Sequence, residues 1–246
     1  MVRPRDFVVK YRIKYAFPCF SGGKDSLVAT HYFIEDTRGL DLEIKVLHVD
    51  TTVMLPGVEE YVRRVAKSLG WDLVVLRPET SFENMVLKYG FPKKTRRWCC
   101  YHLKLKPVIQ YVKRFKGSKA EVLGLRRNES PRRANLPQII FKRDALAWGY
   151  CPIIDWSDEQ VEKYIEEHGL PYPPWYRIGV KETCCCGVFM SEKELMVLRA
   201  RFPDFFRRFV ELESKMKSKG SAFFVANRRI YARDILRQKT LEEVVR

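Results

Sequence analysis

The chain has 246 residues, of which 46% are hydrophobic, and it carries a formal net charge of +16. This composition supports one sizeable buried core and excludes an intrinsically disordered chain. No apolar run approaches the ~20 residues of a membrane span, and the segment 1–20 is interrupted by charges, unlike a signal peptide. We therefore expect a cytoplasmic protein with no membrane partner. Abundant Lys, Arg and Glu with little Gln suggest a thermophilic source.

The positive charge is concentrated in the middle of the chain. Between Lys93 and Arg143 there are sixteen Lys or Arg residues and two acidic residues. Such a field attracts an anionic ligand, and charge alone does not distinguish a small nucleotide from an RNA. For Lys113 to Lys119, an ordinary solvated helix face is the alternative interpretation.

The first predicted elements are a strand over Val8–Phe20 and a helix over Leu27–Glu35. The loop between them reads Ser21-Gly22-Gly23-Lys24-Asp25-Ser26. Two glycines let backbone amides approach an anion, the helix start adds its positive dipole end, and Lys24, Ser21 and Ser26 add side-chain donors. The loop therefore predicts a site for a phosphate or pyrophosphate group. Its spacing differs from that of the P-loop of P-loop NTPases.

Strands and helices continue to alternate along the chain. Apolar strands are expected at Ile44–Val49, Leu73–Leu76 and Val122–Leu123, separated by helices over 58–69 and from about Pro107. This order predicts an α/β fold with a doubly wound, mostly parallel sheet. Ligands of such sheets bind beyond the carboxyl ends of the strands, where Ser21, Asp50 and Gly124 fall.

After residue 138 the pattern changes. Strands are expected at Gln138–Phe141 and Tyr150–Ile154, and capping boxes at Ser157 and Ser191 each open a helix. We expect a main domain over residues 1–206 and a small appendage over 207–246, with a strand at 222–225 and a helix near Leu241.

Seven cysteines include an adjacent pair and a triplet, which fits a reducing compartment better than a disulfide framework. Thiolates are soft ligands that suit zinc or an iron–sulfur cluster. The candidate metal ligands are Cys99, Cys100, Cys184 and Cys186. The isolated Cys19 and Cys151 are interpreted as packed small hydrophobes.

The loop and four later motifs carry a family resemblance. The motifs, in chain order, are His48-Val49-Asp50-Thr51, Thr95 to Cys100 with Lys104, Gly124 to Arg132, and Pro152 to Trp156. From about Cys19 to Phe206 the chain resembles the PP-loop ATP pyrophosphatases, and within them the adenylyl-sulfate and phosphoadenylyl-sulfate (PAPS) reductase family. The resemblance implies an adenine nucleotide alpha hydrolase-like fold.

It also implies a reaction and a set of site residues. A reductase of this family would cleave adenylyl sulfate (APS) or PAPS and release sulfite. By resemblance, Asp50 contacts the adenosine part, Arg126 and Arg132 bind the phosphosulfate as catalytic groups together with Lys24, and the four cysteines hold a [4Fe-4S] cluster, with zinc as the alternative. The nucleotide-binding set is Ser21, Gly22, Gly23, Lys24, Asp25, Ser26, Asp50 and Gly124.

Two departures from the family pattern keep alternatives open. Cys184-Cys185-Cys186 offers C-x-C where the family has C-x-x-C, and the residues after Cys186 contain no cysteine to act as the family's tail nucleophile. Either Cys185 or an external thiol donor would take that role. A second hypothesis is an ATP pyrophosphatase that uses magnesium and adenylates tRNA or another acceptor for sulfur insertion. A third is a nucleic-acid-binding module with a structural zinc. A homo-oligomer is expected in each case.

Overall fold

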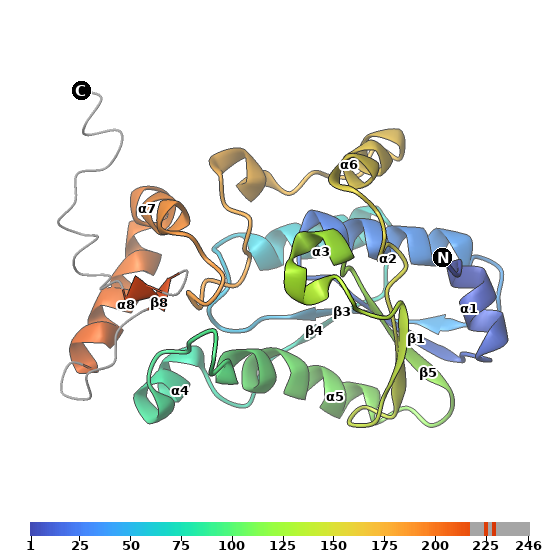
Figure 1. The fold of residues 1–246 in the computed structure, drawn as a ribbon, viewed down its shortest axis with the longest axis horizontal. Helices are drawn as coiled ribbons and strands as arrows, with labels where there is room; N and C mark the ends of the chain where they lie inside the picture. The colour runs from blue at the N-terminus through green and yellow to red at the C-terminus, as the bar shows by residue number, and fades with distance from the viewer. Residues whose placement is uncertain (217–223, 226–227, 230–246) are drawn as a thin grey trace. The chain divides into compact units, whose positions relative to one another are not determined.

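The computed structural model describes residues 1–216, 224–225 and 228–229 (Figure 1). These residues form two compact units. The first comprises Met1–Val49, Glu59–Leu76 and Pro107–Pro173, and the second comprises Asp50–Val58, Arg77–Lys106 and the chain from Pro174 onward.

The first unit is built on a seven-stranded sheet with the order β4-β3-β1-β5-β7-β6, in which β2 also pairs with β1. All pairings are parallel except that of β6 with β7. This confirms the predicted α/β, mostly parallel architecture. The strands are β1 (Tyr15–Cys19), β2 (Glu43–Ile44), β3 (Val46–Val49), β4 (Leu73–Leu76), β5 (Lys119–Leu123), β6 (Ile139–Lys142) and β7 (Ala147–Tyr150).

Helices cover both faces of this sheet, as expected for central strands that are apolar on both sides. On one face, α1 (Pro4–Lys10) and α2 (Lys24–Asp36) pack with Ala16, Ala120 and Val122 in one core cluster. On the other, α5 (Lys106–Val112) packs with Phe17 and Leu47 in a second cluster. Figure 1 shows α2 and α5 on opposite sides of the sheet. The helices α3 (Val58–Ser68) and α6 (Asp158–Glu167) complete the set, and α6 packs on α2.

The predicted strand at Val8–Phe20 is wrong in its first half. Residues Pro4–Lys10 form α1, and β1 begins only at Tyr15. Pro4 is suited to the first turn of a helix, and the ring of Phe7 stacks on that of Tyr150 at 4.2 Å. Phe7 and Val8 are both buried, and burial of this face stabilises the helix. The apolar run alone suits a strand equally well, so the sequence does not distinguish the two.

The predicted strand at Tyr150–Ile154 is displaced. β7 spans Ala147–Tyr150 and pairs antiparallel with β6, and the chain then turns at 152–155. Ile153 and Ile154 are fully buried in this turn, so their apolar character reflects packing and not strand pairing.

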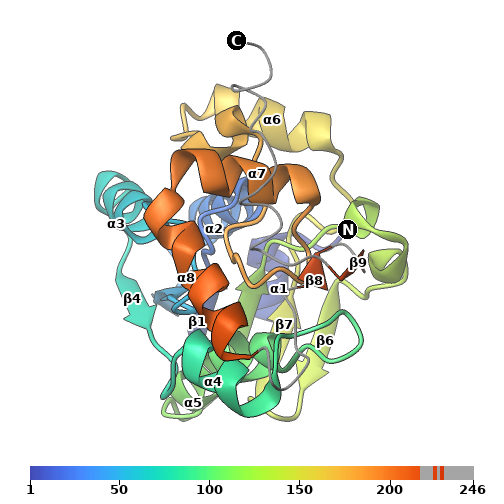
Figure 2. The same ribbon diagram turned by 90° about the vertical axis from the view of Figure 1, so that its left-hand side faces the viewer.

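The second unit is mainly helical. It contains α4 (Phe82–Tyr89), a π-helix at Cys100–Leu105, a 3-10 turn at Pro174–Ile178, α7 (Glu192–Arg201), α8 (Pro203–Lys215) and the strand pair β8 (Phe224–Val225) and β9 (Arg228–Arg229). The predicted capping box at Ser191 is confirmed, because its hydroxyl accepts the Glu194 N–H. Figure 2 shows α7 beside α8, and α8 also contacts α4.

α8 runs through residues 206 and 207, where the sequence analysis divides main domain from appendage, and that boundary stays a prediction. The predicted helix near Leu241 lies outside the described residues, as does the start of the predicted strand at 222–225. Across the described part of the chain, no helix has the length and apolar character required to cross a membrane.

Candidate functional site

The glycine-rich loop connects β1 to α2 and is closed by its own hydroxyl groups. Ser26 donates to the Gly23 carbonyl at 2.8 Å and accepts from the Ser21 N–H at 3.2 Å, and the two serine hydroxyls lie 3.0 Å apart. Gly22 has φ +92°, a conformation that glycine adopts without strain. The loop therefore presents its backbone at the start of a 13-residue helix, where an anion is favoured.

Gly124, directly after β5, packs against this loop. A Cβ added there would lie 2.6 Å from the Asp25 carbonyl oxygen and 2.7 Å from the Ser26 Cα. Backbone atoms cannot yield in the way that a flexible side-chain end can, so this position requires glycine. The structure thus brings Gly124 together with Ser21 to Ser26, as the sequence predicts.

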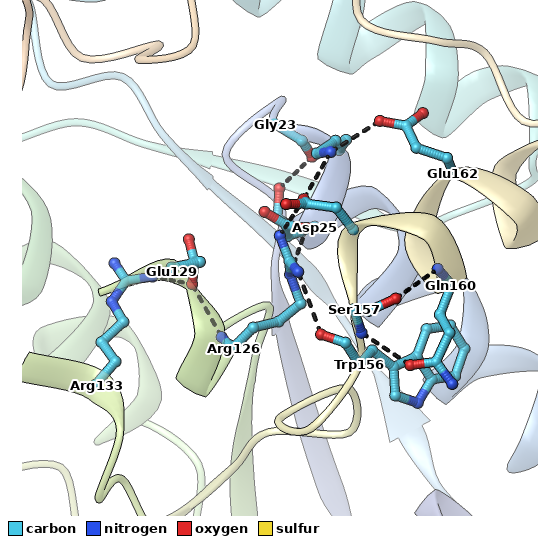
Figure 3. Close-up of polar contacts among 12 residues, drawn as sticks. Gly23, Asp25, Arg126, Glu129, Arg133, Trp156, Ser157, Gln160 and Glu162 are labelled. Atoms are coloured by element: carbon cyan, nitrogen blue, oxygen red, sulfur yellow. Dashed lines mark hydrogen bonds and ion pairs between the residues drawn. The ribbon is translucent and has the colours of Figure 1, made fainter. Parts of the chain in front are cut away.

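Lys24 is held by two carboxylates of α6. Its Nζ donates to Glu162 at 2.8 Å and to Asp158 at 3.0 Å. Burial lowers the pKa of Lys24, but the hydrogen bonds to Glu162 and Asp158 outweigh this effect and the pKa is raised. Figure 3 shows the Glu162 side chain extending toward the loop at Gly23. Lys24 is therefore a charged ammonium that already faces anionic groups.

Arg126 is the most buried cation beside the loop, with 3% of its surface exposed. It donates through Nε to Asp25 at 2.9 Å, through Nη2 to Asp158 at 2.8 Å and through Nη1 to the Trp156 carbonyl at 3.2 Å. Figure 3 shows this fan of contacts around the guanidinium group. The guanidinium group of Arg126 is thus fixed in orientation beside the Asp25 carboxylate of the loop.

The two aspartates respond oppositely to this environment. Burial raises the pKa of Asp25, and the nearby Arg126 only partly offsets the effect. Asp158 is more exposed, and its hydrogen bonds to Lys24 and then to Arg126 lower its pKa. Asp158 therefore contacts both cations, while Glu162 and Asp25 contact Lys24 and Arg126 respectively.

Arg132, predicted to act with Arg126, has a different setting. It is exposed and lies in a 3-10 turn at Pro131–Arg133. The preceding turn at Arg127–Glu129 is anchored by Glu129, which accepts the Arg126 N–H at 2.9 Å and pairs with Arg133. Arg126 is therefore built into the fold, while Arg132 extends from a short turn into solvent.

Sequence reasoning missed Asp158 and Glu162 as site residues. A signal was present, because the Ser157 capping box fixes the start of α6 and residues four apart lie on one helix face. It does not indicate which partner that face meets, which follows only from the packing of α6 on α2.

Asp50 lies in the second unit by its contacts. Its Oδ1 accepts the Thr52 N–H at 2.8 Å, and its Oδ2 accepts from Arg77 Nε at 3.2 Å. The first contact supports Thr52, whose φ is +65°, in an unusual turn conformation. The predicted contact of Asp50 with adenosine remains a prediction.

The second unit also brings the cysteine pair and the triplet together. Cys99 Sγ lies 3.7 Å from Cys186 Sγ, and Thr51 Oγ1 lies 3.6 Å from Cys184 Sγ. Backbone hydrogen bonds of 2.8 Å join Leu55 to Thr183 and Cys185 to Val53, which aligns the triplet with segment 51–55. Cys100 opens the π-helix, a distortion that often marks functional positions.

The thiols perturb one another. A hydrogen bond with Cys99 lowers the pKa of Cys100, while the reverse effect raises the pKa of Cys99. The charge of Cys184 acts to raise the pKa of both Cys99 and Cys100, and that of Cys186 acts to raise the pKa of Cys100. Four thiols in one neighbourhood fit the donor chemistry of zinc or an iron–sulfur cluster. Within residues 1–216, 224–225 and 228–229, no three His, Cys, Asp or Glu side chains are already arranged to hold a metal ion.

Cys185, the predicted nucleophile, has no exposed surface, and burial raises its pKa. A reactive cysteine is usually accessible and ionised, so neither property favours this assignment, which stays a prediction.

Comparison with known proteins assigns this chain to a family. The phosphoadenosine phosphosulfate reductase domain family matches residues 16–209. The chain belongs to this family. An uncharacterised protein of Methanocaldococcus jannaschii is 29% identical over 206 residues, which cover 78% of this chain and 46% of that protein. The adenosine 5'-phosphosulfate reductase of Bacillus mycoides is 25% identical over 179 residues, covering 72% of this chain and 73% of the enzyme. The chain thus spans about half of the first relative and most of the second.

Solved structures agree on the fold. The PAPS reductase of Candida auris, solved in a phosphate complex, aligns with a TM-score of 0.56 at 22% identity, covering 74% of this chain and 87% of that one. The U34-tRNA thiolase of Methanococcus maripaludis, solved with its [4Fe-4S] cluster, aligns with a TM-score of 0.50 at 14% identity, covering 86% and 74%. These similarities confirm the adenine nucleotide alpha hydrolase-like fold.

Proposed function

We propose that this protein binds APS or PAPS with its phosphates at the Ser21–Ser26 loop and reduces it to sulfite. The observation that carries the proposal is the pair of cations at the start of α2. Lys24 and Arg126 are both oriented by Asp158, and both belong to the unit that forms the loop. A phosphosulfate carries several anionic oxygens, which suit an ammonium group and a guanidinium fork placed side by side.

The reaction needs a thiol nucleophile and a reductant. A thiolate sulfur attacks the sulfonyl sulfur, the S–O bond to the nucleotide breaks, and the adenosine phosphate leaves with the bonding electrons. A second thiolate then attacks the thiol-derived sulfur of the resulting S-sulfonate, the S–S bond to the sulfonate breaks, and sulfite leaves with the bonding electrons, so that two thiols are oxidised to a disulfide. We assign both thiols to an external dithiol, because Cys185 is fully buried. The cations at the loop stabilise the leaving phosphate.

Cys99, Cys100, Cys184 and Cys186 would hold the [4Fe-4S] cluster, with zinc as the alternative. Two segments supply four thiols, and Cys99 already contacts Cys186. When bound, an iron–sulfur cluster can change its redox state and with it its charge, whereas zinc has no redox chemistry. Metal analysis distinguishes the two.

A second function has one observation in its favour. Asp25, Asp158 and Glu162 surround Lys24 and Arg126 with carboxylate oxygens, the ligands that Mg²⁺ uses at pyrophosphate sites. An ATP pyrophosphatase would use such a metal to stabilise the leaving pyrophosphate while an acceptor is adenylated. The tRNA thiolase neighbour shares the fold.

One experiment separates the two functions. Anaerobically purified protein is incubated with APS or PAPS and a dithiol, and separately with ATP and Mg²⁺, and both sulfite and pyrophosphate are measured. The proposal predicts sulfite from APS or PAPS and no pyrophosphate from ATP. Pyrophosphate release without sulfite would contradict it and support the second function.

A further inference from the structure

A basic and aromatic surface of the second unit flanks the Cys99-Cys100 pair along the chain and includes none of the phosphate-loop residues. We define it as Lys88, Tyr89, Lys94, Arg96, Arg97, Tyr101, His102, Lys104 and Phe189. We propose that this surface binds single-stranded RNA. The inference goes beyond the proposed function and does not require it.

The charge of this surface is unbalanced. Between Lys88 and Lys106 the chain has seven Lys or Arg residues and no acidic residue. Lys106 pairs with Glu79 at 2.7 Å. Among the residues that the structure describes, none forms an ion pair with the following five: Lys88, Lys94, Arg96, Arg97 and Lys104. A patch of unpaired cations favours a polyanionic partner.

Aromatic rings lie among these cations. Lys88 Nζ lies 5.2 Å and the Arg96 guanidinium 6.0 Å from the centre of the Tyr89 ring, while Arg97 lies 5.7 Å from the centre of the Phe189 ring. The Tyr89 ring stacks on His102 at 6.2 Å, and the Tyr101 ring lies 5.1 Å from that of His102. These contacts form two groups of rings and positive charges, one around Tyr89 and His102 and one at Arg97 and Phe189.

Two of the rings are unusually accessible. Tyr101 is 51% exposed and Phe189 is 49% exposed. Exposed rings beside cations are the arrangement by which proteins stack unpaired bases while neutralising the backbone. A duplex, whose bases are already stacked, cannot use the rings in this way. The geometry therefore favours a single strand.

RNA is favoured over DNA by the hydroxyl and ring-nitrogen groups of this region. The exposed Thr95 and Tyr101 carry hydroxyl groups, and His102 carries ring nitrogens. Such groups can hydrogen-bond a ribose 2'-hydroxyl, which DNA lacks.

The test is fluorescence anisotropy of the full chain with a labelled 15-nucleotide RNA of mixed sequence, titrated at several salt concentrations. We expect binding that weakens with salt, and at least about fivefold weaker binding in Tyr101→Ala and in Phe189→Ala. Lys88→Ala should weaken binding and reduce the magnitude of the salt slope by about one.

Matched controls lie in the first unit. Phe141 is 46% exposed, and Lys10 lies 5.8 Å from the centre of the Tyr11 ring, so both resemble the tested residues. Phe141→Ala and Lys10→Ala should bind RNA like the unchanged protein.

Three results would overturn the proposal. The first is no salt-dependent binding, or binding that these three substitutions leave unchanged. The second is equal affinity for DNA of the same sequence or for duplex RNA. The third is competition by poly-glutamate as effective as that by unlabelled RNA, which would indicate an acidic protein partner. No nucleotide substrate is present, so the outcome is independent of sulfite release.

Discussion

Lys24 and Arg126 share one acceptor, because Asp158 Oδ1 lies 3.0 Å from Lys24 Nζ and 2.8 Å from Arg126 Nη2. Residues separated by about a hundred positions are thus held on a single carboxylate in the first turn of α6. An incoming phosphate would compete with this carboxylate for both cations and with Glu162 for Lys24. We therefore expect the α6 carboxylates to lower the affinity of the loop for anions.

Glu162→Gln should strengthen binding of inorganic pyrophosphate and of AMP about two- to fivefold. The substitution keeps the shape of the side chain and removes a charge that holds Lys24 at 2.8 Å. Glu162 is 42% exposed, which limits the effect. Isothermal calorimetry without divalent metal measures it, with Glu166→Gln on the same helix as the control. Weaker binding in Glu162→Gln would mean that the carboxylate assists the ligand.

Gly124→Ala should weaken nucleotide binding by at least about tenfold and destabilise the protein by about 1–3 kcal/mol. The new methyl group would overlap the backbone of Asp25 and Ser26 and displace the loop. Gly39→Ala is the matched control. Gly39 has φ +84° but no neighbour within 4 Å, so its substitution costs about 1 kcal/mol and leaves binding unchanged. Equal binding in both variants would show that the contact at Gly124 does not shape the loop.

Arg126→Ala and Arg132→Ala should differ in their effect on stability, although both arginines are proposed to bind the phosphosulfate. Arg126→Ala leaves the carboxylate of Asp25 largely buried without its partner, and we expect a loss of about 3 kcal/mol in the free energy of unfolding. Arg132→Ala changes an exposed side chain and should alter stability by less than about 0.5 kcal/mol while weakening phosphosulfate binding. Urea unfolding and calorimetry give the two quantities. If Arg132→Ala binds normally, its predicted role is wrong.

Anaerobically purified protein should contain about four irons per chain. Cys99→Ser should lower this content, because Cys99 links the pair to Cys186. Cys19→Ser, which alters a partly buried thiol outside this set, should leave it unchanged. About one zinc and no iron would favour the structural alternative.

Cys151 should resist alkylation in the native protein. Burial raises its pKa to about 11, and Arg133 and Arg127 only partly offset this effect. The raised pKa keeps the thiol protonated at pH 8, whereas the thiol of the unfolded chain, with its ordinary pKa of 9.0, is already partly ionised at that pH. Stability that depends on the neutral thiol is therefore complete below about pH 9 and falls as the pH rises toward 11. Iodoacetamide labelling, followed by peptide mass spectrometry, should show slow labelling at pH 8 and fast labelling in urea. Equal labelling rates in the native and the urea-unfolded protein would contradict the interpretation of Cys151 as a packed, buried thiol.

Local signals in the sequence predict much of the fold. The alternation of apolar strands and helices predicts the sheet, and the glycines and serines of the loop predict where it bends. The helix α1 was missed because Phe7 and Val8 suit a strand equally well until Tyr150, distant in sequence, packs on them. The π-helix at Cys100 has no sequence signal.

The candidate site was predictable only in part. The loop residues and Gly124 are recognisable because backbone geometry restricts their identity. Asp158 and Glu162 are ordinary acidic residues of a helix start, and their importance comes from the packing of α6 on α2. The spacing of residues along the sequence does not reveal contacts of this kind between distant segments.

The most direct test of the account is calorimetric titration of APS into the unchanged protein and into Lys24→Ala, with thermal unfolding measured in parallel. We predict at least about tenfold weaker binding in the variant at an unchanged unfolding temperature, because Lys24 is proposed to contact the phosphate and its ion pairs are partly exposed. Equal affinity in the two proteins would contradict the assignment of the loop as the phosphate site.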